Sequence, residues 1–146
     1  MRMLVMVLSC VVCMYSSALA EDTSIEDVIS AQIEAFKQED VEKAFTFASP
    51  MIQQLFRSPE NFGNMVQNRY PMVWQPSDVS FLRQKNEGDV VYQVIRFFDA
   101  KGLGTSFVYE MVRVSGEWKI NGVFKIQSDD VSASLQLKKR AEAKHA

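Results

Sequence analysis

The sequence contains very little histidine and cysteine, and this scarcity excludes several kinds of catalytic and metal site. The single histidine, His145, is one residue from the end of a polar segment. A serine or cysteine nucleophile of the triad type needs an imidazole held beside it, and a zinc site needs several His or Cys ligands. The two cysteines, Cys10 and Cys13, lie in an apolar segment at the start of the chain. We therefore expect no metal site and no histidine-dependent nucleophile.

The sequence also lacks a phosphate-binding loop and an excess of basic residues. The stretch KGLGTS is rich in glycine, but it is expected between two strands rather than between a strand and a helix. Lysine and arginine together number 16 against 18 acidic residues, and the formal net charge is -2. Nucleic-acid-binding domains usually carry a clustered basic excess. The composition thus predicts no cofactor and no nucleic-acid partner.

Residues 1–20 have the pattern of a signal peptide for export. Arg2 precedes the apolar run MLVMVLSCVVCMY, and the following SSALA places Ala18 and Ala20 at the small positions before a cleavage site. The apolar run is shorter than the roughly 20 residues that a membrane-spanning helix needs. Cleavage after Ala20 leaves residues 21–146, a length that suits one domain. We expect a periplasmic or secreted protein without a stable membrane span; an uncleaved or lipidated anchor is the alternative.

Helical periodicity dominates the first half of the remaining chain. Ser24 stands three residues before Asp27, which is the spacing of a capping box, and apolar residues then recur on one helical face. The residues of this face are Ile25, Val28, Ile29, Ile33 and Phe36. The Ser-Pro pairs at 49–50 and 58–59 each combine an N-cap residue with proline at the first helical position. The pattern predicts four helical segments, two of them short.

Blocks of β-branched and aromatic residues dominate the second half of the chain. They predict four strands at residues 79–84, 90–98, 105–114 and 118–126, joined by the turns KNEGD, DAKGLG and SGE. Such short connections favour antiparallel neighbours. Helices followed by strands indicate an α+β domain in which the helices pack on one face of an antiparallel sheet.

The turn SGE, read as a three-residue loop, sets a register for the last hairpin. The predicted pairs are Val114 with Trp118, Val112 with Ile120, Glu110 with Gly122 and Val108 with Phe124. This register places a carboxylate, Glu110, in the middle of the face that the helices cover. The opposite face carries Phe107, Tyr109 and Met111, and we expect a homodimer formed through this outer sheet face.

The connector NRYPMVWQP, residues 68–76, is unusually apolar for a hinge between helices and strands. Pro71 and Pro76 bar a continuous helix, and a residue before a proline favours an extended backbone. We expect an extended segment that closes over the apolar interior, with the polar atoms of Tyr70 and Trp74 reaching water or a partner. Two interpretations remain open, a plug over a filled core and a lid over a bound ligand.

The motifs FASP, YPMVW, YEM and WKINGV, in this order, resemble the nuclear-transport-factor-2-like superfamily, and within it a bacterial family known as a domain of unknown function. The resemblance covers Asp22 to Ile126. It implies an α+β cone in which N-terminal helices pack in the concave face of a curved four-stranded antiparallel sheet, with a pocket at the open end. The superfamily contains isomerases, cyclases and non-enzymatic binding modules. We accordingly assign residues 21–127 to this domain and residues 128–146 to a polar, basic tail.

Two functions of different classes are compatible with these residues. The favoured hypothesis is a non-catalytic module that binds a small apolar ligand or associates with itself. Its expected ligand-binding residues are Tyr70, Trp74, Glu110 and Trp118. The alternative is a cofactor-free enzyme of isomerase or cyclase type, in which Glu110 is the base and Tyr70 or Tyr92 donates a hydrogen bond. However, a carboxylate among strands is more often paired with a neighbouring group, and a one-residue shift in register moves Glu110 to the other face.

Overall fold

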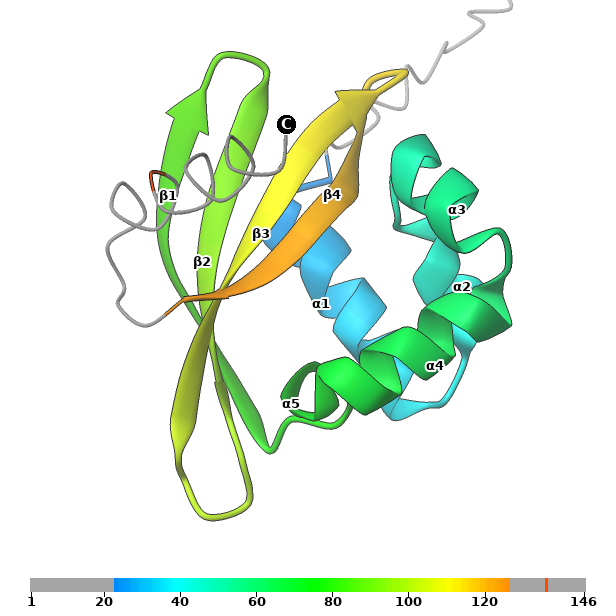
Figure 1. The fold of residues 1–146 in the computed structure, drawn as a ribbon. Helices are drawn as coiled ribbons and strands as arrows, with labels where there is room; N and C mark the ends of the chain where they lie inside the picture. Colours follow the sequence, from blue (N-terminus) through cyan, green and yellow to red (C-terminus); the bar gives the residue numbers. More distant parts are fainter. Residues whose placement is uncertain (1–22, 127–135, 137–146) are drawn as a thin grey trace, which may run out of the picture.

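The computed structural model describes residues 23–126 and Gln136. The predicted signal peptide, residues 1–20, lies outside the described residues, as does the predicted tail at residues 128–146 apart from Gln136. Within the described part of the chain, five helices come first and four strands follow. The helices lie together on one side of the sheet (Figure 1).

Three of the helices, the first, third and fourth, begin where the sequence predicts. The helices are α1 (Ile25–Lys37), α2 (Val41–Thr46), α3 (Pro50–Phe56), α4 (Pro59–Arg69) and α5 (Pro71–Trp74). At the start of α1, the Ser24 hydroxyl accepts a hydrogen bond from the Asp27 N–H and the Asp27 carboxylate accepts one from the Ser24 N–H, so the predicted capping box forms. Ser49 and Ser58 cap α3 and α4 through their side-chain oxygens, each followed by proline. These local signals fix the helix starts.

The connector after α4 contains a helical turn, so the prediction of an extended segment at residues 68–76 is wrong. Pro71 occupies the first position of α5, where the missing N–H is not needed. The N–H groups of Val73 and Trp74 donate to Tyr70 O at 2.8 and 3.0 Å. Tyr70 itself leaves the helical region, with φ −131°, as expected for a residue before proline. The two prolines therefore limit α5 to a single turn, but they do not prevent a helical turn from forming.

The strands form an antiparallel meander in the order β1-β2-β3-β4. They are β1 (Asp78–Glu87), β2 (Val90–Phe98), β3 (Gly104–Val114) and β4 (Glu117–Ile126). The last hairpin turns through Ser115 and Gly116, both at positive φ, which is typical of a two-residue turn that matches the twist of the strands. The predicted α+β class and the four-stranded antiparallel sheet are confirmed.

The sequence predicts the register of the last hairpin correctly only for the residue pairs far from the turn. The turn has two residues rather than three, because Val114 pairs with Glu117. Contrary to the prediction, Trp118 faces Arg113 and Ile120 faces Met111. A β-bulge at Asn121 then adds one residue to β4. The pairs beyond the bulge are as predicted, Glu110 with Gly122 and Val108 with Phe124.

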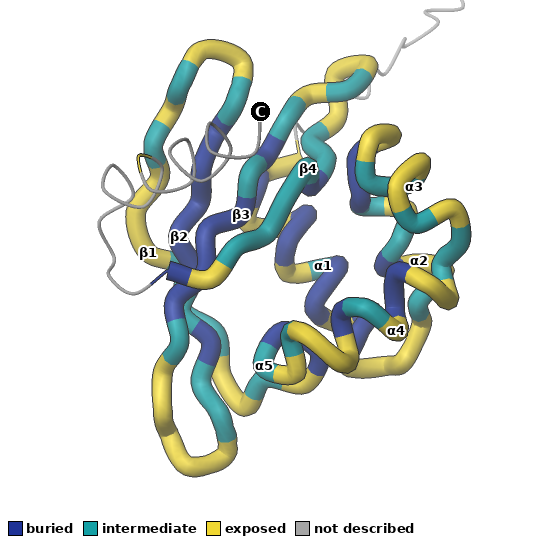
Figure 2. The backbone as a smooth tube through the Cα atoms, in the orientation of Figure 1, coloured by how far each residue is buried: buried dark blue, intermediate teal, exposed yellow. Residues whose placement is uncertain are grey.

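Two β-bulges accompany the curvature of the sheet, one at Asn121 and one in β1 between Phe81 and Gln84. A bulge bends its strand and increases the local twist. The helices pack in the resulting concave face (Figure 1), as the superfamily resemblance implies. Figure 2 shows that buried residues follow α1 and the middle of the sheet, whereas the hairpin tips are exposed.

The main hydrophobic core lies between the helices and the concave face. Phe107, Tyr109 and Met111 belong to this core and are only 4%, 0% and 0% exposed. The prediction that they form an outer face, and a homodimer through it, is therefore wrong. Both faces of β3 are apolar, and alternation along a strand defines two faces without determining which one the helices cover.

The opposite face of the sheet carries a smaller buried cluster. It consists of Tyr92, Val94, Val108 and Ile126, with Val90 and Phe124 packed against it. Tyr92, a candidate donor in the enzyme hypothesis, thus lies on the face away from Tyr109 and the helices. The two sequence-predicted tyrosine donors, Tyr70 and Tyr92, do not share a site.

Candidate functional site

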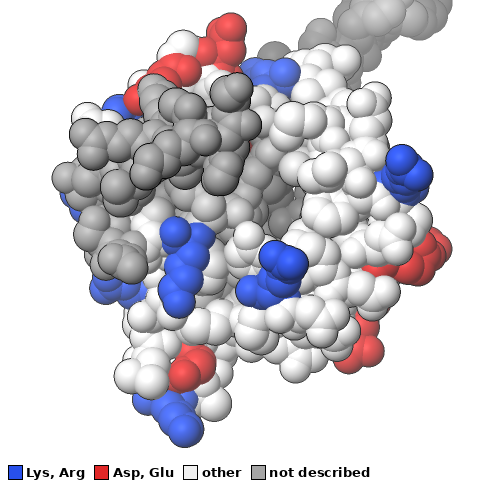
Figure 3. All heavy atoms as spheres, in the orientation of Figure 1, with Lys and Arg blue, Asp and Glu red and all other residues white. Residues whose placement is uncertain are grey.

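A cavity of about 510 Å³ lies between the helices and the concave face of the sheet. Sixteen described residues line it: Gln32, Phe36, Ala48, Ile52, Leu55, Phe56, Phe62, Met65, Val66, Arg69, Tyr70, Val73, Tyr109, Ile120, Gly122 and Val123. Most of these side chains are apolar. Figure 3 shows a hollow in the surface between β4 and the helices, bordered mainly by uncharged atoms.

Helix α3 forms a thin outer wall of the cavity. The segment before it pairs with β4, because the Ser49 N–H donates to Ile120 O at 2.8 Å and the Ile120 N–H donates to Phe47 O at 2.8 Å. The helix is therefore held at its first turn, although it contains no fully buried residue. It contributes Ile52, Leu55 and Phe56 to the cavity wall.

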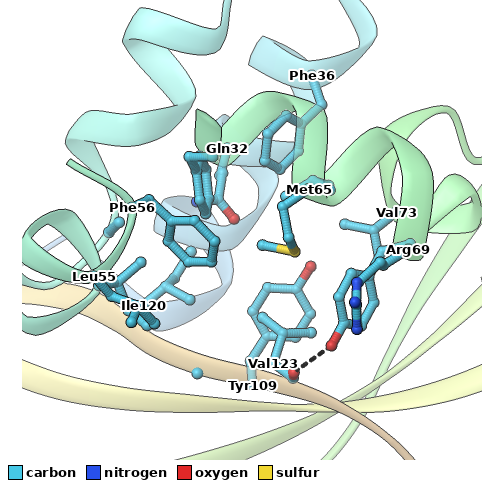
Figure 4. Close-up of a pocket in the computed structure, with 16 residues that line it drawn as sticks. Gln32, Phe36, Leu55, Phe56, Met65, Arg69, Val73, Tyr109, Ile120 and Val123 are labelled. Carbon is cyan, nitrogen blue, oxygen red and sulfur yellow. Dashed lines mark hydrogen bonds between the residues drawn. The ribbon is translucent and has the colours of Figure 1, made fainter. Parts of the chain in front are cut away.

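Tyr109, in the middle of β3, supplies an unusual polar group to the cavity. Its side chain is fully buried, and its hydroxyl has no hydrogen-bond partner within the described part of the chain. Figure 4 shows the hydroxyl directed into the cavity toward Met65. Burial raises the pKa of Tyr109 far above its ordinary value, and the nearby Tyr70 raises it further. The hydroxyl is thus a neutral donor at physiological pH, and leaving it unpaired costs free energy.

Tyr70 is the residue among the four predicted ligand-binding residues that lines the cavity. Its hydroxyl donates to Val123 O at 3.4 Å, and its ring centroid lies 6.0 Å from that of Phe107. A distance of 3.4 Å is long for an O–H···O hydrogen bond. The hydroxyl can therefore turn toward a ligand at little cost.

Two further polar side chains face the cavity, one from its interior and one from its rim. Gln32 is 2% exposed, and its Nε2 donates to Ala44 O at 3.1 Å. Its side-chain oxygen points toward the cavity (Figure 4). Arg69, the last residue of α4, is exposed and is the only charged residue among the described residues that line the cavity. It forms no ion pair with another described residue.

Trp74 and Trp118, both predicted to bind a ligand, are not among the lining residues. Trp74 packs in the core with its ring centroid 5.4 Å from that of Phe36. Trp118 lies under Arg113, whose guanidinium carbon is 4.4 Å from the ring centroid. Both tryptophans therefore make packing contacts. The aromatic character of a residue does not show, from the sequence alone, whether it packs in the protein or contacts a ligand.

Glu110 lies outside the cavity wall and is hydrogen-bonded. Alternation along β3 directs it to the face opposite Tyr109. Its Oε1 accepts a hydrogen bond from Asn121 Nδ2 at 2.7 Å, and Asn121 Oδ1 accepts one from Ser49 Oγ at 2.7 Å. These bonds join β3, the bulge of β4 and the N-cap of α3. A carboxylate in this role does not favour the enzyme alternative, which requires Glu110 as a base within a cavity.

Replacing Asn121 with alanine is expected to lower the free energy of unfolding by about 2 kcal/mol, because a buried Ser49 hydroxyl and Glu110 each lose a partner. Urea unfolding followed by far-ultraviolet circular dichroism measures the change. Asn64→Ala, at an exposed position of α4, is the matched control and is expected to change stability by less than about 0.5 kcal/mol. Equal, small effects of the two substitutions would show that the hydrogen bonds of Asn121 with Ser49 and Glu110 do not stabilise the attachment of α3 to the sheet.

The sequence interpretation missed Tyr109, Gln32 and Arg69 as residues of the site. Gln32 carried a usable signal, because it falls in the buried apolar stripe of α1 beside Ile29 and Ile33. Tyr109 was assigned to the wrong face of the sheet. Arg69 carried no signal, since a basic residue in the last turn of a helix is ordinary.

Residues 23–126 and Gln136 contain no group of three or more His, Cys, Asp or Glu side chains that could hold a metal ion. In the same part of the chain, no helix has the length and apolar character needed to cross a membrane.

A curved antiparallel sheet with helices in its concave face, and a cavity between them, is an α+β fold similar to that of nuclear-transport-factor-2-like proteins. The chain belongs to the family DUF4864, a domain of unknown function, which matches residues 18–133. The resemblance to this superfamily and to a domain-of-unknown-function family is thus confirmed. No curated protein matches the chain.

Solved structures share the fold at low sequence identity. A SEC-C motif containing protein from Rhodopseudomonas palustris aligns with a TM-score of 0.50 and 14% identity, over 73% of this chain and 81% of its own. A variant of Rd1NTF2_05 aligns with a TM-score of 0.50 and 11% identity, over 69% of this chain and 95% of its own. An NTF-2 like protein of unknown function from Shewanella oneidensis MR-1 aligns with a TM-score of 0.47 and 14% identity, over 69% and 94%. The first two similarities support the fold alone.

Proposed function

We propose that this protein is an exported, non-catalytic module that binds a small, mainly apolar molecule in the cavity between its helices and its sheet. The observation that carries the proposal is the Tyr109 hydroxyl, which is fully buried, faces an apolar cavity and has no partner among the described residues. A buried donor without a partner costs roughly 1–3 kcal/mol. A bound molecule with one hydrogen-bond acceptor recovers that cost.

The size and lining of the cavity suit such a molecule. Ligand pockets are usually about 300–1,000 Å³ and are lined by apolar side chains with a few placed polar groups. The cavity of about 510 Å³ lies within this range. A cavity of this size suits a single small ligand.

The lining offers binding groups and no general base. None of the described lining residues is Asp, Glu, His, Lys or Cys. Burial raises the pKa of Tyr109, so its phenolate is not accessible at neutral pH. Glu110, the base of the enzyme alternative, is held by Asn121 outside the wall. Binding is therefore favoured over isomerase or cyclase chemistry, and self-association through Phe107, Tyr109 and Met111 is not proposed because these side chains are buried.

Native mass spectrometry of the protein, purified gently from its own host, tests both the export and the binding. Export is supported by the signal-like residues 1–20 and predicts a chain that begins at Glu21. Binding predicts an added mass that is lost on denaturation. A chain that begins at Met1 contradicts cleavage after Ala20, and recovery of that chain from the cytoplasm alone contradicts export. A protein that carries no added mass and also fails to bind the apolar fluorophore N-phenyl-1-naphthylamine contradicts the binding proposal.

Replacing Met65 with tryptophan is expected to weaken binding of N-phenyl-1-naphthylamine, an uncharged apolar fluorophore, by about tenfold or more, because the larger side chain occupies the cavity. Met65→Leu conserves the side-chain volume and is expected to bind within about twofold of the unaltered protein. Fluorescence titration measures both affinities, and urea unfolding verifies that both variants are folded. If both variants bind as the unaltered protein does, the fluorophore binds elsewhere and the cavity is not the site.

A further inference from the structure

The polar groups of the cavity are not distributed evenly around it. Figure 4 shows Arg69 on one side of the cavity, Leu55, Phe56 and Ile120 on the opposite side, and the Tyr109 hydroxyl between them. Tyr70, next to Arg69 in the chain, also lines the cavity. The cavity thus has one end with three donors, the polar end, and a mainly apolar end formed by α3 and β4. Gln32 lies near Phe56 at this second end, with its Nε2 hydrogen-bonded to Ala44 O. A ligand that matches this distribution is itself polar at one end and apolar at the other.

The charge of the polar end is positive. Arg69 is the only charged residue among the described lining residues, and it forms no ion pair with another described residue. A guanidinium offers donors in a fixed fork that fits a carboxylate, and hydrogen bonds to an ionised acceptor are about twice as strong as neutral ones. The Tyr109 hydroxyl adds a donor that lacks an acceptor within the described chain. Both groups favour an anionic acceptor over a second cation or a hydrocarbon.

We infer that the ligand of this cavity is an amphiphilic anion, whose carboxylate-like head accepts hydrogen bonds from Arg69 and from the Tyr109 hydroxyl and whose hydrocarbon body lies against α3. This inference rests on the proposed function, because it identifies the ligand class of the same site. The exposed Arg69 at the rim allows the head to keep contact with solvent, so the charge is not fully desolvated. Leu55 lines the cavity although it is 67% exposed. A bound hydrocarbon would cover this exposed apolar side chain.

Decanoate and 1-decanol are suitable probes, since they share an alkyl chain and differ in the charge of the head. Each is titrated as a competitor of bound N-phenyl-1-naphthylamine on the protein comprising residues 21–146. We expect decanoate to bind about tenfold more tightly than 1-decanol. Arg69→Met is expected to remove this preference, measured as the ratio of the affinities for decanoate and 1-decanol in the same protein. Arg69→Lys keeps the charge and is expected to retain most of the preference.

The outcomes separate this inference from the proposed function. Failure of the fluorophore to bind, together with the absence of an added mass in the native protein, contradicts the proposed function and the inference together. Binding of the fluorophore with equal affinities for decanoate and 1-decanol, or with no displacement by either, overturns the inference and leaves the proposed function standing. An unchanged preference for decanoate in Arg69→Met also overturns it. A preference that Arg69→Met removes and Arg69→Lys retains supports it.

Discussion

Replacing Trp74 with alanine is expected to lower the free energy of unfolding by about 4 kcal/mol. Trp74 is 8% exposed, and its ring centroid lies 5.4 Å from that of Phe36. It also lies beside Gly63 of α4, since a Cβ at Gly63 would be at an ordinary contact distance of 3.9 Å from the Trp74 ring. Truncation of this side chain removes its buried apolar surface and leaves a cavity that the surrounding helices fill only in part. This is the largest loss of stability that we predict.

Urea unfolding followed by far-ultraviolet circular dichroism measures the loss, because it does not depend on tryptophan fluorescence. Trp118→Ala is the matched control and is expected to cost about 1–2 kcal/mol, since Trp118 is only partly buried, between Arg113 and the edge of the main core. If Trp74→Ala costs less than about 1 kcal/mol and abolishes binding of the fluorophore, the hypothesis of a lid at residues 68–76 regains support. A large loss of stability instead identifies the connector as part of the core.

Replacing Tyr109 with phenylalanine is expected to stabilise the ligand-free protein by about 1 kcal/mol at pH 7 and by about 3 kcal/mol near pH 11.5. At neutral pH the substitution removes a buried donor that has no partner among the described residues. At alkaline pH a second effect is added. Burial raises the pKa of Tyr109 in the folded state, so the folded protein keeps this proton while the unfolded chain loses it above about pH 10.

The sign of the alkaline effect follows from proton binding. Above about pH 10 the unfolded chain binds fewer protons at this site than the folded chain does, so the stability of the unaltered protein falls as pH rises, by up to about 1.4 kcal/mol per pH unit. The phenylalanine variant lacks this contribution and has a shallower decline. Urea unfolding at several pH values between 7 and 11.5 measures the difference. Below pH 10 the difference between the two proteins is expected to be constant.

Tyr70→Phe is the matched control for Tyr109→Phe, because both remove one hydroxyl from the cavity wall. The Tyr70 hydroxyl has an acceptor in Val123 O, so its removal is expected to lower stability by about 0.5 kcal/mol rather than raise it. A loss of stability in Tyr109→Phe at pH 7 would falsify the view that the hydroxyl is unsatisfied in the ligand-free protein. A gain in stability combined with weaker decanoate binding indicates that the protein retains the hydroxyl for its ligand.

Much of the fold was predictable from short-range features of the sequence. Ser24, Ser49 and Ser58 each satisfy backbone N–H groups at the start of the helix that follows them, and these bonds involve residues only three positions apart. The strands were predicted within a few residues, because β-branched and aromatic runs end at turn residues such as Gly88 and Gly116. The α+β class followed from the order of these elements.

Of the four residues that the sequence analysis selected as ligand-binding, one, Tyr70, lines the cavity. Its position depends on the adjacent Pro71, which is a local effect visible in the sequence. Trp74, Trp118 and Glu110 were selected for their chemistry, and their surroundings in the folded chain give them packing and hydrogen-bonding roles outside the cavity wall. Whether an aromatic or acidic side chain reaches a cavity depends on neighbours that are distant in sequence.

The sequence by itself determined the helix starts, the strands, the antiparallel order and the resemblance to a superfamily, because capping, periodicity and turn chemistry act within a few residues. Only the tertiary structure decided which face of β3 the helices cover, and thus that Tyr109 faces the cavity while Glu110 faces away. Both faces of this strand are apolar, so their burial depends on long-range packing rather than on alternation. The tertiary structure also decided the bulge at Asn121. The added residue reverses the face to which the side chains between the bulge and the turn point.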